Sequence, residues 1–217
     1  MIDLSNVTLV CADTKKPERA VFAMHECMKH AKFKEAILFT NERCYYRGIY
    51  TEVIPKISSR EDYSRFIIRE MVDYVDTEMI MICQWDGYIV NQEAWSDEFL
   101  KYDYIGAPWW RNEEYNVGNG GFSMRSRRLM DYVSQVMNKV DHIERDHGIH
   151  CPTPPDHPED DVICRRLRRG LEVLGFTFAP EEVAHRFSWE GNGKFRKYNG
   201  AFGIHGRVDE FERWKQR

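Results

Sequence analysis

The sequence predicts an α/β fold in which a parallel sheet carries helices on both faces. Three observations predict it. Apolar runs of strand length alternate with amphipathic segments of helix length from the N-terminus onward. The run 79–83 is apolar at every position, which is typical of a central strand covered on both faces. A length of 217 residues suits a single domain over 1–217.

Composition and charge narrow the classes of partner. Hydrophobic residues make up 42% of the chain and charged residues 30%, as in ordinary globular proteins. The net charge of −4 gives no reason to expect nucleic acid or an anionic membrane as a partner. No apolar run is long enough for a transmembrane segment, and no signal peptide is visible. The six cysteines are widely spaced. We therefore expect a cytoplasmic protein with reduced thiols.

The N-terminal part predicts a β-α-β unit. Residues 7–12 form an apolar, β-branched strand, and a helix over 17–33 begins at a proline. Residues 35–40 form the second strand. Strand, helix and strand in about 35 residues imply a parallel pair joined by a right-handed crossover. A third short strand is expected within 50–54.

A second helix is predicted over 61–75. Ser59, three residues before Asp62, is close to a capping box. Arg65 and Arg69 share one face, where they are either solvated or in contact with a nucleotide phosphate. The opposite face should pack into the core through Tyr63, Phe66, Ile67, Met71 and Tyr74.

The central strand 79–83 ends at Gln84-Trp85-Asp86-Gly87. A carboxylate at the carboxyl end of a central strand lies where open α/β sheets bind ligands. There Asp86 either helps to hold a divalent cation or opens a turn with Gly87. A further strand at 103–108 leads to Trp109 and Trp110. One indole should be exposed, because strand side chains alternate, and it either stacks on a sugar ring or covers the core.

Glycines 118, 120 and 121 allow the backbone to approach a ligand closely, or they form a structural turn. A helix predicted over 126–142 should place its amino end near this loop. The loop 147–157 contains histidines and prolines, but its spacing matches no zinc pattern. A final amphipathic helix is expected over 208–217.

Three consecutive carboxylates, Glu159, Asp160 and Asp161, precede another helix. They either complement the helix dipole or supply a general base at a cleft. The basic run 165–169 on that helix is interpreted as a solvated face. His205 is either a core histidine or a metal ligand.

The order of these segments resembles that of the GT-A class of nucleotide-sugar-dependent glycosyltransferases. Their local amino-acid sequences are similar to those of an uncharacterised bacterial and viral family of unknown function with a GT-A-like fold. Chlorovirus-encoded glycosyltransferases are a related possibility. The likeness spans nearly the whole chain, and it implies a GT-A fold with a Rossmann-like, mixed but mostly parallel sheet, and a place in the host cytoplasm if the gene is viral. The blocks that carry it are QWDGYIVN, DYIGAPWW, VGNGGFSMRSRRL, HPEDDVICR, FAPEEVAHRFSWE and FGIHG.

The resemblance implies roles by position. Asp86 matches the last acidic residue of the Asp-x-Asp metal motif, and His205 matches a late metal-binding histidine, so the pair would hold Mn²⁺ or Mg²⁺. The first acidic residue of the motif is replaced by Gln84, which either weakens metal binding or contacts the donor ribose. Asp160 would be the catalytic base, with Glu159 as its neighbour. The remaining implied donor contacts are Ala12, Asp13, Thr14, Tyr63, Arg65, Gln84, Trp85, Asn119 and Gly120.

The implied function is an inverting, metal-dependent transfer of a sugar from a nucleotide diphosphate sugar, expected to be UDP-linked, to a glycan or other hydroxyl acceptor. A non-catalytic nucleotide-sugar or glycan-binding module stays open, given Gln84. A sugar-phosphate nucleotidyltransferase is less supported, because residues 13–17 after the first strand contain no glycine.

Overall fold

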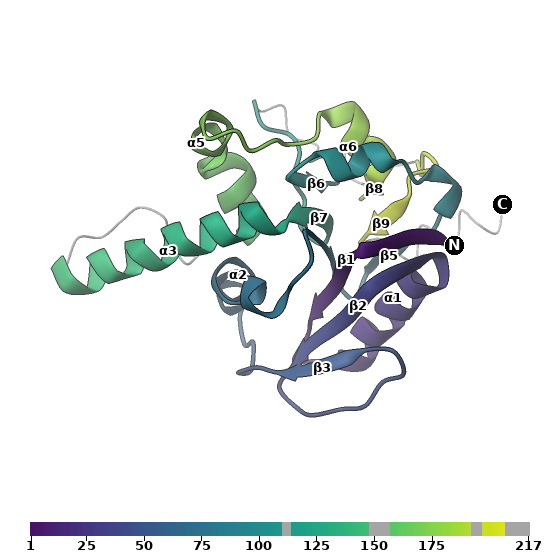
Figure 1. The fold of residues 1–217 in the computed structure, drawn as a ribbon, viewed down its shortest axis with the longest axis horizontal. Coiled ribbons are helices and arrows are strands. Elements are labelled where there is room, and N and C mark those ends of the chain that lie inside the picture. The colour runs from purple at the N-terminus through teal and green to yellow at the C-terminus, as the bar shows by residue number, and fades with distance from the viewer. Residues whose placement is uncertain (110–113, 148–156, 192–196, 207–217) are drawn as a thin grey trace.

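The structure, a computed structural model, describes residues 1–109, 114–147, 157–191 and 197–206 (Figure 1). Its main sheet has the strand order β3-β2-β1-β4-β7-β6. The pairs β3–β2, β2–β1 and β1–β4 are parallel, whereas β7 runs antiparallel to both of its neighbours. The expected mixed, mostly parallel sheet is therefore confirmed. Its strands are β1 (Ile2–Ala12), β2 (Ala31–Thr40), β3 (Tyr50–Val53), β4 (Met79–Cys83), β6 (Tyr104–Gly106) and β7 (Phe122–Ser126).

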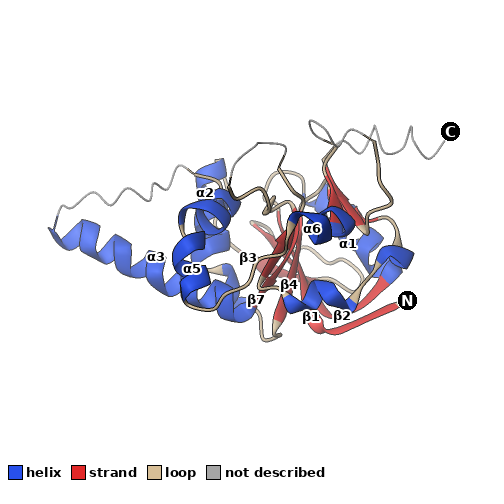
Figure 2. Cartoon of the chain, turned by 90° about the horizontal axis from the view of Figure 1, so that it is seen from above, coloured by secondary structure: helices blue, strands red, loops and turns tan. Residues whose placement is uncertain are grey.

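Helices cover both faces of this sheet, as predicted (Figure 2). The side chains of β4 alternate between two cores, since strand residues point to opposite faces in turn. Met81 packs on the side of α1 and α6, and Ile80 on the side of α2, α3 and α5. The helices are α1 (Pro17–His30), α2 (Arg60–Arg69), α3 (Arg127–His147), α4 (Glu159–Asp161), α5 (Arg168–Val173) and α6 (Glu181–Phe187), with a π-helical turn η4 (Val162–Arg166) and 3₁₀ turns η1 (Met71–Tyr74), η2 (Gln92–Ala94) and η3 (Asp97–Lys101).

The β1-α1-β2 unit is present, with small differences at its ends. Helix α1 stops at His30 rather than near residue 33, because β2 already begins at Ala31, which pairs with Ile2. The capping box at Ser59 and Asp62 is also confirmed. Helix α2 ends at Arg69 rather than near residue 75, because the chain continues as the 3₁₀ turn η1.

The prediction that Tyr74 belongs to the core face of this segment is wrong. Its side chain is 41% exposed, although its ring packs against Phe39 with the centroids 5.3 Å apart. Phe66, Ile67 and Met71 are buried, as expected.

Strand β7 was not predicted, and it changes the position of the helix that follows the glycine-rich loop. The strand pairs with β4 from Cys83↔Phe122 to Met79↔Ser126 and so carries the chain back across the sheet. Helix α3 then begins at the opposite edge, where the Arg127 amide donates to the Glu78 carbonyl. The expectation that its amino end lies near the loop is therefore wrong.

A second, three-stranded sheet has the order β5-β9-β8. Its strands are β5 (Gly87–Ile89), β8 (Ser188–Trp189) and β9 (Gly203–His205). Strand β9 is antiparallel to β5 and parallel to β8. This small sheet brings together the segment after β4 and the last described strand, which are more than a hundred residues apart in the chain.

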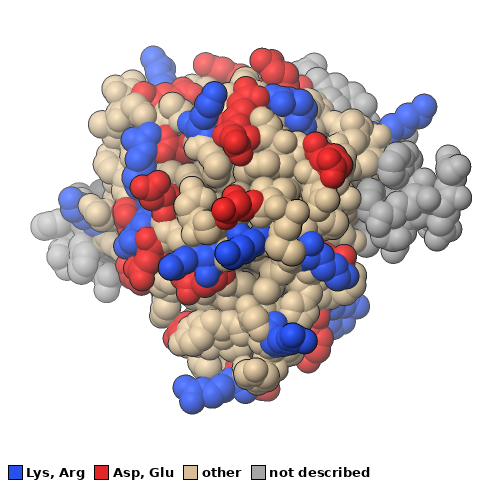
Figure 3. Space-filling model, turned by 45° about the vertical axis from the view of Figure 1, so that its right-hand side comes forward, with Lys and Arg blue, Asp and Glu red and all other residues tan. Residues whose placement is uncertain are grey.

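Three expectations fall outside the described residues: the exposure of Trp110, most of the loop 147–157, and the helix over 208–217. Among the described helices, none combines the length and the apolar character needed to cross a membrane. On the face shown in Figure 3, basic and acidic side chains are interspersed rather than gathered by sign.

Candidate functional site

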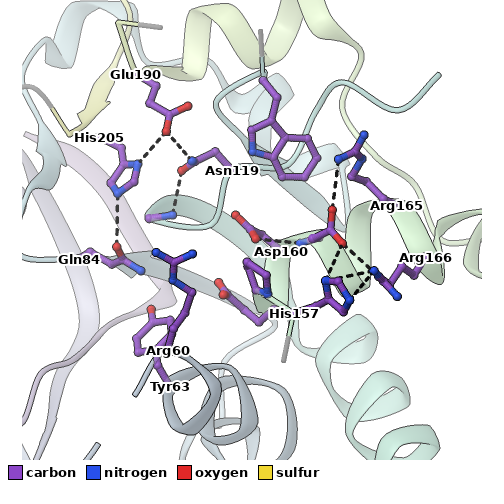
Figure 4. A pocket seen from close by; sticks show the side chains of 15 residues that line it. Arg60, Tyr63, Gln84, Asn119, His157, Asp160, Arg165, Arg166, Glu190 and His205 are labelled. Carbon is purple, nitrogen blue, oxygen red and sulfur yellow. Dashed lines mark hydrogen bonds and ion pairs between the residues drawn. The ribbon is translucent and has the colours of Figure 1, made fainter. Parts of the chain in front are cut away.

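A cavity of about 780 Å³ opens at the carboxyl edge of the parallel strands, beside the end of β4. This volume is in the range of small-molecule sites. Figure 4 shows side chains converging on it from α2, from the loops after β4 and before β7, and from α4, η4 and β9. The lining residues are Arg60, Tyr63, Gln84, Trp109, Asn119, Gly121, His157, Pro158, Glu159, Asp160, Asp161, Arg165, Arg166, Glu190 and His205.

The structure brings Asp86 and His205 together at one side of this cavity. Pairing of Gly87 with His205 across β5 and β9 sets them side by side, and Nε2 of His205 lies 3.6 Å from Oδ1 of Asp86. The same nitrogen lies 3.3 Å from Oε1 of Gln84. Asp86 does not line the cavity itself, and its Oδ1 is buried with no hydrogen-bond partner. An orphaned buried carboxylate oxygen beside an imidazole is a candidate pair of metal donors.

Charge around His205 opposes the effect of its burial. Burial lowers the pKa of the imidazole, but the carboxylates of Glu190 and Asp86 outweigh it and leave the pKa raised. A metal ion bound at Nε2 would therefore have to displace a proton when the ring is protonated.

Gly121 allows the imidazole of His205 to lie where it does. A Cβ at Gly121 would come within 1.9 Å of His205 Nε2. The Gly121 amide donates to Asn119 Oδ1 over 3.0 Å, and its carbonyl accepts from the Gln84 amide over 2.7 Å. The glycine-rich loop is thus held against the end of β4, as a structural turn would be, and its close approach to a ligand stays a prediction.

Asp160 lies near the centre of the cavity (Figure 4). Its Oδ2 accepts from the Gly120 amide over 2.9 Å and its Oδ1 from the Asp161 amide over 2.8 Å. Burial, and then the negative charge of Glu159, raise the pKa of Asp160 to about 7. A carboxyl group with this pKa can accept a proton near neutral pH, as a general base must.

Glu159 has a different environment from Asp160. Its Oε1 accepts from Arg125 over 2.9 Å, and both side chains are almost completely buried. Arg125 also donates to Ser123 and lies over the Tyr104 ring, 4.8 Å from its centroid. A buried carboxylate tied to a buried guanidinium is suited to hold the loop and α4 together, which leaves Asp160 as the candidate base.

A charged cluster lines the side of the cavity formed by η4. Asp161 accepts from Arg165 over 3.2 Å and from Arg166 over 3.1 Å, and His157 lies against Arg166. The guanidinium of Arg165 lies 5.5 Å from the ring of Trp109, which is partly buried and lines the cavity. Arg165 and Arg166 thus line the cavity, which the interpretation of the basic run as a solvated face did not include, although Arg166 is exposed as that interpretation expects.

Several expected donor contacts lie outside this cavity. The residues at the end of β1 are at the same edge of the sheet, but Asp13 accepts from the amides of Lys15 and Lys16, and the Thr14 hydroxyl bonds to the backbone of Ile57. The side chains of Asp13 and Thr14 therefore stabilise backbone segments through hydrogen bonds. The expected contacts absent from the cavity lining are Ala12, Asp13, Thr14, Arg65, Trp85 and Gly120.

The side chains of Arg65 and Trp85 do not reach the cavity. Arg65 is exposed on α2, whereas Arg60 at the first turn of that helix reaches the cavity. Trp85 is 46% exposed, and the guanidinium of Arg19 lies 5.2 Å from its ring. Tyr63, Gln84 and Asn119 do line the cavity, as the sequence led us to expect.

Sequence reasoning missed Arg125, Glu190 and Arg60. Arg125 is completely buried at the end of an unpredicted strand, and no local pattern distinguishes it from a surface arginine. Glu190 follows the two-residue strand β8, and the signal that could have indicated it is its position just before a glycine, as at Asp86.

Residues 48–205 match a protein family described as "Protein of unknown function (DUF5672)". The chain belongs to the DUF5672 family. The match begins before β3 and ends at His205, so every cavity-lining residue falls inside the DUF5672 region. No sequence among the curated proteins matches the chain.

The fold of this DUF5672 chain is similar to solved glycosyltransferases. A glycosyltransferase involved in the glycosylation of the major capsid of PBCV-1 is 11% identical, with a TM-score of 0.57 over 97% of this chain and 99% of that one. GlyE of Streptococcus pneumoniae is 10% identical, with a TM-score of 0.55 over 96% and 59%. The galactosyltransferase LgtC, solved with donor and acceptor sugar analogs, is 11% identical, with a TM-score of 0.54 over 91% and 86%. At these identities the likeness establishes the fold alone.

Proposed function

We propose that the chain is a GT-A-type glycosyltransferase that moves a sugar from a nucleotide diphosphate sugar, UDP-linked in the first instance, to a glycan or other hydroxyl acceptor. One observation carries the proposal. A carboxyl group with a pKa of about 7, Asp160, lies in a cavity of about 780 Å³ that the imidazole of His205 also lines. A base for the acceptor and a site for the leaving diphosphate are the two parts that such a transfer requires.

The place beside Asp86 and His205, where the donor diphosphate would lie, suits a divalent cation of the Mn²⁺ or Mg²⁺ type. Asp86 supplies an oxygen without a hydrogen-bond partner, and His205 supplies Nε2 beside it. Within the described ranges, no group of three His, Cys, Asp or Glu side chains is placed to hold a metal. Such ions commonly use one or two protein ligands together with substrate phosphates and water. When bound, the ion would neutralise charge on the departing diphosphate.

In the proposed reaction the acceptor hydroxyl oxygen forms a bond to the anomeric carbon, and the bond from that carbon to the diphosphate oxygen breaks. Asp160 takes the hydroxyl proton, and the nucleotide diphosphate leaves with the electron pair. The amides of Gly120 and Asp161 orient the carboxylate before the acceptor arrives. Attack from the face opposite the leaving group gives inversion.

A non-catalytic nucleotide-sugar-binding role is the second candidate. It is favoured by Gln84, which stands in place of an acidic residue and lies 3.3 Å from the His205 nitrogen that would bind the metal. A binding module of this kind would take up the donor without releasing free nucleotide diphosphate.

A two-stage experiment tests the proposal. Nucleotide sugars are first screened by thermal shift with and without Mn²⁺, because a ligand that binds the folded state raises its apparent stability. Release of nucleotide diphosphate from each donor that binds is then measured with a panel of hydroxyl acceptors. Metal-dependent stabilisation followed by turnover supports the transferase, whereas binding without turnover across the panel supports the binding module. Absence of any stabilisation contradicts both.

A further inference from the structure

Arg60, the first residue of α2, carries a positive charge into the cavity. Tyr63 lies three residues later, on the same face of the helix, and it also lines the cavity, so this face of α2 looks onto the site. Figure 4 shows the Arg60 guanidinium pointing from α2 into the cavity, with Gln84 on one side of it and Asp160 on the other.

The backbone that carries Arg60 is fixed by the capping box. Asp62 accepts from the amides of Ser58 and Ser59, and the Ser59 hydroxyl accepts from the Asp62 amide over 3.0 Å. These bonds hold the start of the helix before any ligand arrives, so the arginine is presented to the cavity from a rigid element.

Arg60 differs from the other arginines of the cavity in its partners. Arg165 and Arg166 both donate to the carboxylate of Asp161. Arg60 makes no hydrogen bond or ion pair with any residue that the structure describes, and its side chain is exposed. An anion that enters the cavity would therefore displace water from this guanidinium and would not have to break an ion pair.

We propose that Arg60 binds the phosphate groups of the donor, an inference that rests on the proposed function. A guanidinium holds phosphate by charge-assisted hydrogen bonds, which are frequently bidentate. The candidate cation site at Nε2 of His205 has one carboxylate, Asp86, because Gln84 stands where the metal motif has its first acidic residue. Arg60 supplies a further positive charge to the same cavity, so part of the affinity for the diphosphate does not depend on a metal ion.

Arg65 provides a matched control for this role. It is exposed on the same helix and has the same charge, but it does not line the cavity. Five residues along a helix turn a side chain by about 140°, which is why the two arginines face different surroundings.

The test measures binding by calorimetry with EDTA present, so that no divalent ion takes part. The probes are inorganic pyrophosphate and UDP, with uridine as the reference that has no phosphate. We expect Arg60→Met to weaken binding of both anions by about 10-fold, the usual contribution of a hydrogen bond to a charged group. Uridine binding should not change. Arg60→Lys should retain part of the affinity, because it keeps the charge without the planar fork. Arg65→Met should leave every affinity nearly unchanged, and melting curves verify that each variant is folded.

Three results would overturn the inference. They are a protein that binds neither pyrophosphate nor UDP in EDTA, an Arg60→Met variant that binds both as tightly as the unchanged protein, and an equal loss in Arg65→Met, which would show a general effect of net charge. Metal-dependent sugar transfer alongside any of these results would leave the proposed function standing. Pyrophosphate binding that depends on Arg60, without turnover of any nucleotide sugar, would instead keep Arg60 as an anion-binding residue and contradict the transferase.

Discussion

The amide of Gly120 donates a hydrogen bond to Oδ2 of Asp160 over 2.9 Å. This bond joins the glycine-rich loop to the first turn of α4, forty residues later in the chain. No side chain fits at Gly120, since a Cβ there would lie 2.3 Å from Oε1 of Glu159. The loop therefore orients the carboxylate that we propose as the base, and the glycine is required for that contact.

Asp160→Asn removes the proposed base with little change in size. We expect the transfer rate to fall by about 10²–10⁴-fold, the usual contribution of a general base. Donor binding should be retained, because the carboxamide has no part in holding the diphosphate. Rates of nucleotide diphosphate release and donor titration by calorimetry measure the two effects. Turnover at the original rate would show that another group accepts the proton.

The rate should depend on pH through the ionisation of Asp160. Because the pKa of Asp160 is raised to about 7 and the base must be ionised, activity should rise from pH 5 and level off above pH 7 to 8. A carboxyl group with an ordinary pKa of about 4 would give a flat profile over this range. Glu159→Gln removes a charge that raises this pKa, so the rise should move to lower pH. If Glu159→Gln leaves the pH dependence of the rate unchanged, that dependence does not come from the ionisation of Asp160.

Gly121→Ala should displace the imidazole of His205, because the added Cβ would lie 1.9 Å from Nε2. We expect Mn²⁺ affinity, measured with UDP present, to fall by at least about 10-fold, comparable to losing a supporting residue of a metal site. Gly170→Ala is the matched control. Apart from the backbone of its own helix, no atom lies within 4 Å of its added Cβ, and alanine in a helix should stabilise the fold by roughly 0.5–1 kcal/mol. If Gly121→Ala and Gly170→Ala bind Mn²⁺ with equal affinity, His205 is not a metal ligand.

Arg125→Met leaves the buried carboxylate of Glu159 without its partner. Breaking a buried ion pair in this way typically costs about 3–5 kcal/mol of unfolding free energy, which urea denaturation measures. Lys29→Met, which breaks an exposed pair with Glu26, should cost less than about 1 kcal/mol. The double variant Arg125→Met with Glu159→Met should be more stable than Arg125→Met alone. A single variant as stable as the double one would mean that the pair contributes little.

Local patterns in the sequence predicted most of the elements and several residues of the cavity. The apolar run of β4, the capping box at Ser59 and the glycines before β7 each depend on neighbours within a few residues. The resemblance to the GT-A class then led us to expect Asp86, Asp160 and His205 at one site, and Asp160 and His205 do line one cavity. Their roles as metal ligands and base stay predictions.

The amino-acid pattern alone was therefore enough to predict most of the larger strands and helices, though not β7, and the segments that carry polar groups toward the cavity. Which side chains meet at the cavity depended on how these elements pack in three dimensions. Strand β7 turned the start of α3 to the far edge, and the pairing of β8 with β9 set Glu190 beside His205. The physical reason is that hydrophobic periodicity and capping act over a few residues, whereas register between distant strands depends on the packing of the whole sheet.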